Sequence, residues 1–317
     1  MKKIFSRKAT FAAMAFALTS GAALAADLPH YKAPPPPPPP PPPLWTGFYV
    51  GLNAGGTWAN SNSIRTLGAP IFAFPAGFGG PFAVASALGV VSNSYLSGGN
   101  NGGFIGGGQI GYNWQFYNSF VAGIEADIQG IAYSNGTQNS VTGMSLGPWG
   151  FPAENYIAIS SARKNVDYIG TVRGRLGWLF TPTLLAYGTG GLAYGGVSMS
   201  TNFFAQESLG AGVYPPVFGA TSFSDTRVGW TVGGGLEWMF WPNWSAKVEY
   251  LYYDLGTVST SGFLAQICTA CGGGGFVNPG VWGAAVTQTT TRFNGNIVRA
   301  GVNYHFNWGA PPVVAKY

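Results

Sequence analysis

Eight charged residues stand at alternate positions of several short segments, and their types and spacing suit ion pairing in a confined space. Side chains two positions apart lie on the same face of a β-strand. An isolated buried charge is very costly, so such side chains must be paired and hydrogen-bonded. Counting from the adjoining turns, we expect Glu125 opposite Arg175, and Asp127 opposite Arg173. The set holds four anions and four cations: Glu125, Asp127, Arg173, Arg175, Glu237, Lys247, Glu249 and Arg299.

Residues suited to catalysis are few. The segment "GGGQIG" at 106–111 matches the dinucleotide pattern G-x-G-x-x-G, but no strand-to-helix transition follows, so we interpret these as strand glycines. His30 lies near the start of the chain, and His305 is predicted to point inward near its end. A surface hydrolase would need an acid–base residue at the opposite, outer rim. The sequence therefore indicates no enzyme and no cofactor.

The two cysteines, Cys268 and Cys271, stand in "CTACGGGG". Two thiolates are too few for an all-cysteine zinc site. In an exported loop the favoured state is a disulfide. A redox role is less favoured, because no thioredoxin-like βαβ pattern surrounds the pair.

The charged residues must be positioned by strands, because the sequence alternates with period two. In "LWTGFYVGLNAGGTW", Phe48, Val50, Leu52 and Trp58 share one parity, and small or polar residues mostly share the other. The fold is predicted to be all-β, with seven further strands at 103–114, 120–130, 167–179, 184–197, 226–239, 244–254 and 295–306.

The start of the chain and its composition indicate a membrane barrel. Lys2, Lys3, Arg7 and Lys8, the apolar stretch 9–24 and an A-x-A site at 23–25 form a signal peptide. Without it, 11 Lys and Arg face 10 Asp and Glu, a net charge of +1 that suggests no nucleic-acid partner. Only 8% of residues are charged, and no later apolar run reaches about 20 residues. A closed barrel is then the remaining membrane-spanning solution.

The connections and the aromatic residues agree with that interpretation. Tight turns at "FYNS", "TPT" and "WPN" alternate with four long connections, as in outer-membrane barrels with periplasmic turns. Aromatic residues flank each tight turn, for example Trp114, Trp178 and Trp244, and predict an interfacial girdle. The apolar strand faces are therefore expected to contact lipid, and the charged residues to face the interior.

The chain resembles the outer-membrane immunogenic proteins of alphaproteobacteria, which are small OmpA-like, porin-family barrels. The resemblance rests on "AADLP", "WTGFYVGLNAGG", "YIGTVRGRLGW", "GWTVGGGLEW", "KVEYLYYDLG" and "NIVRAGVNYHF". It implies an eight-stranded antiparallel outer-membrane barrel with exposed loops. Some relatives bind haemin at the cell surface. Since the loops here contain no histidine, the remaining candidate ligands are Tyr95, Tyr133, Tyr156 and Tyr214.

The predicted organisation has four parts: a signal peptide (1–25), a proline-rich periplasmic tail (26–44), the barrel with four long surface loops (45–306) and a short periplasmic tail (307–317). Ten consecutive prolines at 34–43 predict a stiff polyproline II rod, as a spacer or as a ligand for peptidoglycan or a periplasmic partner. The apolar stretch 71–91 is expected to cap the barrel mouth or to contact an extracellular ligand or host surface.

Two roles for the interior remain open. Eight strands enclose a space that side chains just fill, which favours a closed electrostatic plug. Inward glycines at 51, 55, 107, 111, 229, 233 and 301 would instead leave room for a narrow water path. Three functions follow from these observations. The favoured one is a structural, surface-exposed protein of the cell envelope. The alternatives are a slow pore for small solutes and a surface receptor for haemin or another apolar ligand.

Overall fold

The structure is a computed structural model that describes residues 45–73, 94–96, 102–117, 119–133, 138–146, 154–207, 216–268 and 280–306. The chain divides into Met1–Pro41 and Pro42–Tyr317, and every described residue belongs to the second unit. The predicted signal peptide, proline run and C-terminal tail therefore lie outside the described residues, as does most of the apolar stretch 71–91. No helix in the described part of the chain is long and apolar enough to cross a membrane.

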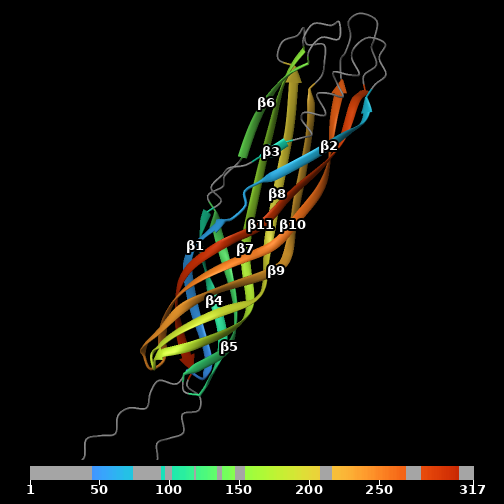
Figure 1. The fold of residues 1–317 in the computed structure, drawn as a ribbon. Helices are drawn as coiled ribbons and strands as arrows, with labels where there is room; N and C mark the ends of the chain where they lie inside the picture. Colours follow the sequence, from blue (N-terminus) through green and yellow to red (C-terminus); the bar gives the residue numbers. More distant parts are fainter. Residues whose placement is uncertain are drawn as a thin grey trace, which may run out of the picture. The chain divides into compact units, whose positions relative to one another are not determined.

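Eight antiparallel strands close into a ring (Figure 1), and Phe48↔Phe306 to Ala59↔Gly295 join the last strand to the first. Each strand pairs with its neighbours in the ring, so no sheet edge remains within the barrel. The ring order is β1 (Gly47–Ala59), β4 (Gly102–Phe116), β5 (Phe120–Tyr133), β7 (Glu154–Thr181), β8 (Leu184–Glu207), β9 (Val217–Trp241), β10 (Trp244–Cys268) and β11 (Gly280–Phe306).

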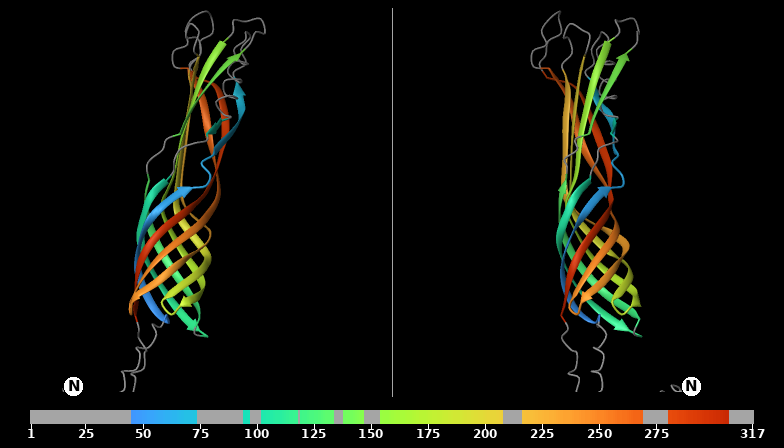
Figure 2. Two further views of the ribbon diagram at one scale, coloured as in Figure 1. Left: turned by 60° about the vertical axis from the view of Figure 1, so that its left-hand side comes forward. Right: turned by 90° about the vertical axis from the view of Figure 1, so that its left-hand side faces the viewer.

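The last five strands are much longer than predicted. They continue past the barrel, at the end away from the tight turns, into an extension that also holds β2 (Ile64–Ala73), β3 (Ser94–Leu96) and β6 (Gln138–Leu146) (Figure 2). Much of the sequence predicted as long loops is therefore strand. The reason is visible in β11, where Thr287, Thr289 and Thr291 point inward and Gln288 is exposed. The alternation continues there without a continuous apolar face.

The barrel exterior is apolar, as predicted. Outward side chains are well exposed throughout the ring, for example Leu52 (74%), Leu176 (69%) and Val228 (67%). Aromatic residues surround the three tight turns, where the Trp178 and Phe180 rings lie 4.6 Å apart. A second aromatic group, not predicted, borders the extension and includes Trp58, Phe104 and Trp230. Two aromatic bands around an apolar belt match the two interfaces of a bilayer.

The barrel interior is filled in layers. At the turn end an apolar layer contains Trp45, Val121, Leu179, Leu185, Tyr187 and Met239. A charged layer follows, and beyond it inward side chains become apolar again, with Ile105, Ile169, Leu251, Phe293 and Ile297 in one buried cluster. Polar side chains therefore occupy only part of the interior, because inward positions next to the extension carry large aliphatic and aromatic residues.

Candidate functional site: the interior charge network

All eight charged residues singled out in the sequence meet inside the barrel and are almost fully buried. Arg173 on β7 is their centre: its Nη2 lies 2.5 Å from Glu125 Oε1 and 2.8 Å from Asp127 Oδ2, and its Nη1 lies 3.0 Å from Glu249 Oε1. One guanidinium thus joins carboxylates from β5 and β10 across the barrel interior. Charge-assisted bonds of this kind are stronger than neutral ones.

Arg299 and Lys247 complete this half of the network. Arg299 Nη2 lies 2.5 Å from Glu249 Oε2 and 2.9 Å from Asp127 Oδ2. Lys247 Nζ donates to both oxygens of Glu125, at 2.8 Å each. Every carboxylate of this half faces at least two cations, so the desolvation cost of each charge is offset within the cluster.

A smaller group lies closer to the tight turns around Glu237. Arg175 Nη2 lies 2.6 Å from Glu237 Oε2, and the other carboxylate oxygen accepts from Ser245 at 2.6 Å and from Asn303 at 2.8 Å. His305 points inward as predicted, with Nε2 3.5 Å from Glu237 Oε1 and 2.8 Å from Ser245 Oγ. These bonds tie β7, β9, β10 and β11 together.

The expected pairing of strand positions is wrong by two residues. Glu125 stands opposite Arg173, and Arg175 stands opposite Gly123. Arg175 still approaches Glu125, but at 3.6 Å and with the Tyr49 hydroxyl between their chains. Counting from the turns failed because β5 and β7 are staggered: Phe120, the first residue of β5, stands opposite Trp178, three residues before the end of β7.

The sequence reasoning missed the uncharged members of the network. Tyr49 donates to Glu125 at 2.6 Å and accepts from Arg175 at 3.1 Å, and Tyr187 donates to Glu249 at 3.0 Å. The Tyr187 ring also lies 4.1 Å from the Arg175 guanidinium. A signal was present, since Tyr49 and Tyr187 stand at inward positions of predicted strands. The other uncharged members that bond to the carboxylates or to one another are Asn53, Gln109, Gln129, Thr171, Ser245 and Asn303.

The inward glycines do not leave open space. At all seven positions an added Cβ would meet another atom within 2.9 Å. At Gly111 it would lie 2.3 Å from the Tyr49 ring, and at Gly51 it would lie 2.0 Å from Asn303 Oδ1. At Gly51 and Gly111 the nearest atoms belong to network side chains, and at the other five positions the nearest atom is a backbone carbonyl oxygen of the neighbouring strand, so none of the seven has open space beside it.

Trp45 fills the turn end of the interior. It is fully buried, its Nε1 donates to Pro182 O at 3.0 Å, and its backbone N–H donates to Gln115 Oε1 at 3.1 Å. Its ring meets His305 edge-on, with centroids 5.8 Å apart. Trp45, two residues before the first strand, therefore closes the barrel beneath Glu237.

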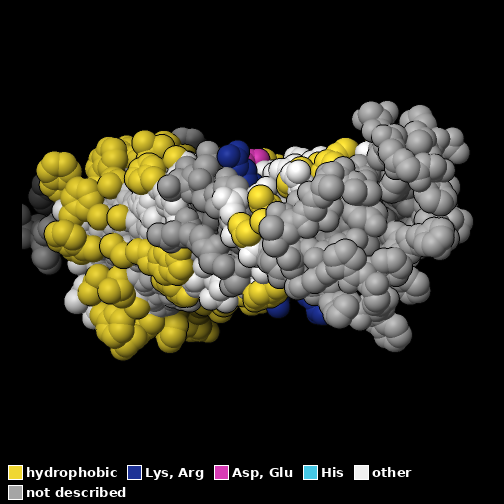
Figure 3. All heavy atoms as spheres, turned by 90° about the horizontal axis from the view of Figure 1, so that it is seen from above, with side chains coloured by type: hydrophobic (Ala, Val, Ile, Leu, Met, Phe, Trp, Pro, Cys, Tyr) yellow, Lys and Arg dark blue, Asp and Glu magenta, His cyan; other side chains and the backbone are white. Residues whose placement is uncertain are grey.

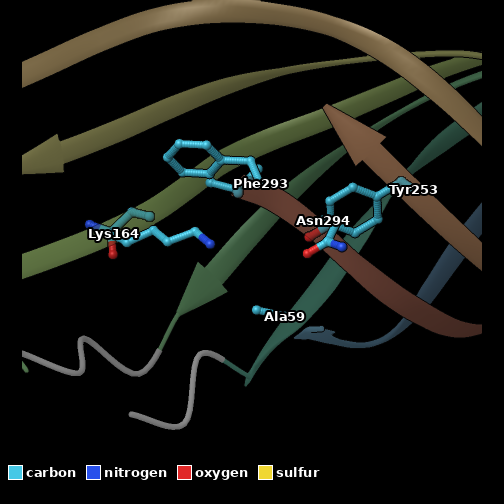
Figure 4. Close-up of a pocket in the computed structure, with 7 residues that line it drawn as sticks. Ala59, Lys164, Tyr253, Phe293 and Asn294 are labelled. Atoms are coloured by element: carbon cyan, nitrogen blue, oxygen red, sulfur yellow. The ribbon is translucent and has the colours of Figure 1, made fainter. Parts of the chain in front are cut away.

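Lys164, which lies in a predicted loop, is a buried cation on β7 just beyond the barrel. Its Nζ donates to Ser61 O at 2.8 Å and to Arg292 O, and it lies 4.8 Å from the Phe293 ring centroid (Figure 4). Among the described residues no carboxylate lies within ion-pair distance, and burial lowers its pKa to about 8. A cavity of about 10 Å³ adjoins it, lined also by Ala59, Tyr253, Phe293 and Asn294. That volume suits about one water molecule.

The remaining predicted residues lie mostly outside the part of the chain whose side chains the structure describes. Cys268 ends β10, but its side chain and Cys271 lie outside the described part, so the disulfide stays a prediction. Of the four tyrosines considered for haemin, Tyr95 on β3 is 64% exposed. The side chains of Tyr133, Tyr156 and Tyr214 lie outside the described part.

Comparisons with known proteins agree with this architecture. A family model described as "Outer membrane protein beta-barrel domain" matches residues 11–306. The 31 kDa outer-membrane immunogenic protein of Brucella melitensis is 38% identical over 217 residues, which cover 67% of this chain and 72% of that protein. A 22 kDa outer membrane protein of Rhizobium leguminosarum bv. viciae is 31% identical over 150 residues, covering 47% of this chain and 52% of the relative.

Solved structures of low identity are also similar. OprG of Pseudomonas aeruginosa aligns with a TM-score of 0.33 at 9% identity, covering 82% of this chain and 97% of that chain. Neisserial surface protein A aligns with a TM-score of 0.30 at 12% identity, covering 82% and 98%. The family match extends over nearly the whole chain, and the eight-stranded ring carries its apolar side chains outward, so the protein belongs to the outer membrane protein β-barrel family and resides in the bacterial outer membrane, in contact with lipid.

Proposed function

We propose that this protein is a non-conducting, non-enzymatic barrel with a structural and surface-exposed role in the cell envelope. The observation that carries the proposal is the stacking of three filled layers across the interior. An apolar layer around Trp45, the charge network around Arg173 and an apolar layer around Ile169 follow one another along the barrel. Hydrated ions would have to cross two dry layers and displace a neutral set of ion pairs.

The proposed orientation places the tight turns and both termini in the periplasm and the strand extension outside the cell. Short turns on the periplasmic side and long segments on the outer side are the pattern of outer-membrane barrels. The extension would then present its strands and connecting segments to the environment. This fits the name of the Brucella melitensis relative, an outer-membrane immunogenic protein.

Planar-bilayer conductance of the refolded mature chain tests the proposal. Heat-shifted gel mobility first confirms that the barrel has folded. We expect a silent membrane for the unaltered chain and also for Glu125→Ala, because the apolar layers on both sides of Glu125 remain. Reproducible conductance steps from the unaltered chain would overturn the closed-barrel proposal and favour the narrow pore.

A pore that is blocked by the charge network alone predicts a different set of conductances for the variants. If the charge network were the only barrier, Glu125→Ala or Arg175→Ala would raise conductance while Trp45→Ala would not. If the layers act together, conductance would require Trp45→Ala combined with changes in the charge network and in the apolar layer around Ile169. Comparing these variants in one bilayer system distinguishes a single barrier from several.

A further inference from the structure

The outer surface of the extension carries a face of uncharged polar side chains on β8, β9, β10 and β11. Its members are in register across these strands, where Ser200 pairs with Ser222 and Ser259 with Thr290. The residues between them, such as Met199 and Thr289, are buried inside the extension. We call this surface the neutral face, which comprises Ser198, Ser200, Asn202, Ala220, Ser222, Ser224, Thr226, Thr257, Ser259, Ser261, Gln288 and Thr290.

The neutral face lacks the charges of an ordinary solvent-exposed sheet. All its members except Ala220 carry a hydroxyl or an amide, and none carries a charge. In soluble domains about one residue in four is charged. Exposed charged side chains border the face, with Arg163 opposite Ser200 and Arg292 opposite Thr257. A surface of this composition fits a neutral, hydroxyl-rich partner better than an ionic one.

The hydroxyls of the neutral face retain hydrogen-bonding capacity. A hydroxyl can donate one hydrogen bond and accept others. Ser259 Oγ and Thr290 Oγ1 lie 3.1 Å apart and bond to each other. Ser222, Ser224 and Ser261 form no side-chain hydrogen bond within the described part of the chain. These three hydroxyls are therefore free to bond to a partner.

β9 and β10 stay adjacent across the neutral face, although their direct pairing is interrupted between Asp254 and Leu264. Arg227, whose side chain starts at an inward position of β9, reaches β10 with its Nη2 3.4 Å from Thr257 O. The interruption leaves backbone groups of both strands outside the regular ladder. Polar backbone groups thus lie next to the hydroxyls of the face.

Exposed aromatic rings border the neutral face at both ends. Phe204 and Phe218 are direct partners on β8 and β9, both are exposed, and Phe263 on β10 is 52% exposed. At the other end Trp230 belongs to the aromatic band that borders the extension. Aromatic rings present an apolar surface to the C–H faces of sugars, while hydroxyls bond to sugar hydroxyls. Sheet faces are known to bind oligosaccharides in other β folds.

The neutral face begins directly beyond the lipid-contacting belt. Thr226 stands four residues from Trp230 on β9, roughly 13 Å along the strand at about 3.3 Å per residue. Polar headgroups extend about 5–8 Å beyond the hydrocarbon core. In Figure 3 polar side chains and backbone, drawn white, adjoin the large hydrophobic area. The face therefore starts near the outer limit of the headgroups, where the sugars of a membrane glycolipid lie.

We propose that the neutral face binds the saccharide part of a glycolipid in the leaflet that borders the extension. The acyl chains of this lipid contact the apolar strand faces of the barrel, and its sugars follow β8, β9 and β10 from Thr226 towards Phe218. The inference rests on the proposed orientation, which places the extension outside the cell. It is independent of whether the barrel conducts.

Native mass spectrometry of the refolded chain tests this site with two probes that share one lipid A. One probe carries a core oligosaccharide and the other carries no further sugar. We expect retention of the core-bearing probe over the other. The variant S222A/S224A should reduce this preference about tenfold, because two hydrogen bonds to the sugars are lost. Heat-shifted gel mobility confirms the folding of each variant.

The matched control is T181A/T183A, which removes two hydroxyls at the same spacing from the β7–β8 turn and should retain the preference. Phe218→Ala removes a ring without removing a hydroxyl, and should also weaken retention of the core-bearing probe. Equal retention of the two probes by the unaltered chain, or equal loss in the control, would overturn the proposal. Displacement by free core oligosaccharide at the probe's concentration would identify a soluble saccharide as the ligand, whereas resistance supports the glycolipid.

The orientation is tested separately. Maleimide labelling of Ser261→Cys on intact cells, in a chain that also carries Cys268→Ser and Cys271→Ser, reports whether the extension lies outside. Labelling supports the outer leaflet as the source of the glycolipid. A chain that prefers the core-bearing probe but is not labelled would overturn the orientation and the outer-leaflet source. A labelled chain without the preference would overturn the saccharide site alone.

Discussion

Arg173 and Glu125 stand directly opposite each other on β7 and β5, and their side chains meet at 2.5 Å inside the barrel. The same guanidinium reaches Asp127 and Glu249, so a single cation connects three carboxylates from two strands. The four anions and four cations balance, which makes a buried charged layer compatible with a folded barrel.

Replacing Arg173 with Met should therefore strongly destabilise the barrel. The change leaves Glu125, Asp127 and Glu249 with fewer cationic partners, and breaking a buried ion pair typically costs about 3–5 kcal/mol. Urea unfolding in lipid vesicles, followed by tryptophan fluorescence, measures the change in the free energy of unfolding. Arg163→Met, at an exposed position of the same strand, should change it by about 0.5 kcal/mol or less. Equal losses in both variants would contradict a special role for the network.

Adding one methyl group at an inward glycine should disturb the network through Tyr49. In Gly111→Ala the new Cβ would lie 2.3 Å from the Tyr49 ring, so the ring must move and loosen its bond to Glu125. Overpacking of this kind costs about 1–3 kcal/mol. Gly130→Ala on the outward face of β5 is the control, because nothing lies within 4 Å of its Cβ position. If both variants unfold at the same urea concentration, the interior is less tightly filled than described.

Trp45 offers two graded substitutions at the turn end. Trp45→Phe should retain most of the packing and lose the bond to Pro182 O, at a cost of about 1 kcal/mol. Trp45→Ala should cost about 3–5 kcal/mol, because it also leaves a cavity beside Val121 and Met239. The same unfolding assay compares the two. An Ala variant no less stable than the Phe variant would mean that Trp45 does not seal this end.

Lys164 should give the barrel a stability that rises with pH above neutrality. Burial lowers its pKa from the ordinary 10.5 to about 8, so the folded chain releases this proton first. Between about pH 8 and 10.5 the unfolded chain binds more protons, and the free energy of unfolding increases with pH. We expect the unaltered chain to show a steeper rise over this interval than Lys164→Met. Parallel pH profiles for the two proteins would rule out a depressed pKa.

Much of the barrel could be predicted from the sequence, because a membrane-facing strand must obey a local rule. In β1, Leu52 must face lipid and Asn53 must not, so the alternation itself reveals the two faces. The same parity identified all eight network charges. The alternation of apolar and polar residues could not reveal the extension. There Thr287 and Thr289 point inward, and their outward neighbours, such as Gln288, do not form a continuous apolar face.

The sequence by itself determined the compartment, the strand periodicity and the set of inward charges, since these depend on hydropathy and on the two-residue repeat of a strand. Only the tertiary structure decided which charges meet. Arg173 rather than Arg175 lies opposite Glu125, because β5 and β7 are staggered so that Phe120 pairs with Trp178. Closure of the ring then brought Tyr49, Lys247 and Arg299 from distant strands to the same carboxylates. Such contacts depend on strand order and stagger, and no local segment encodes either of them.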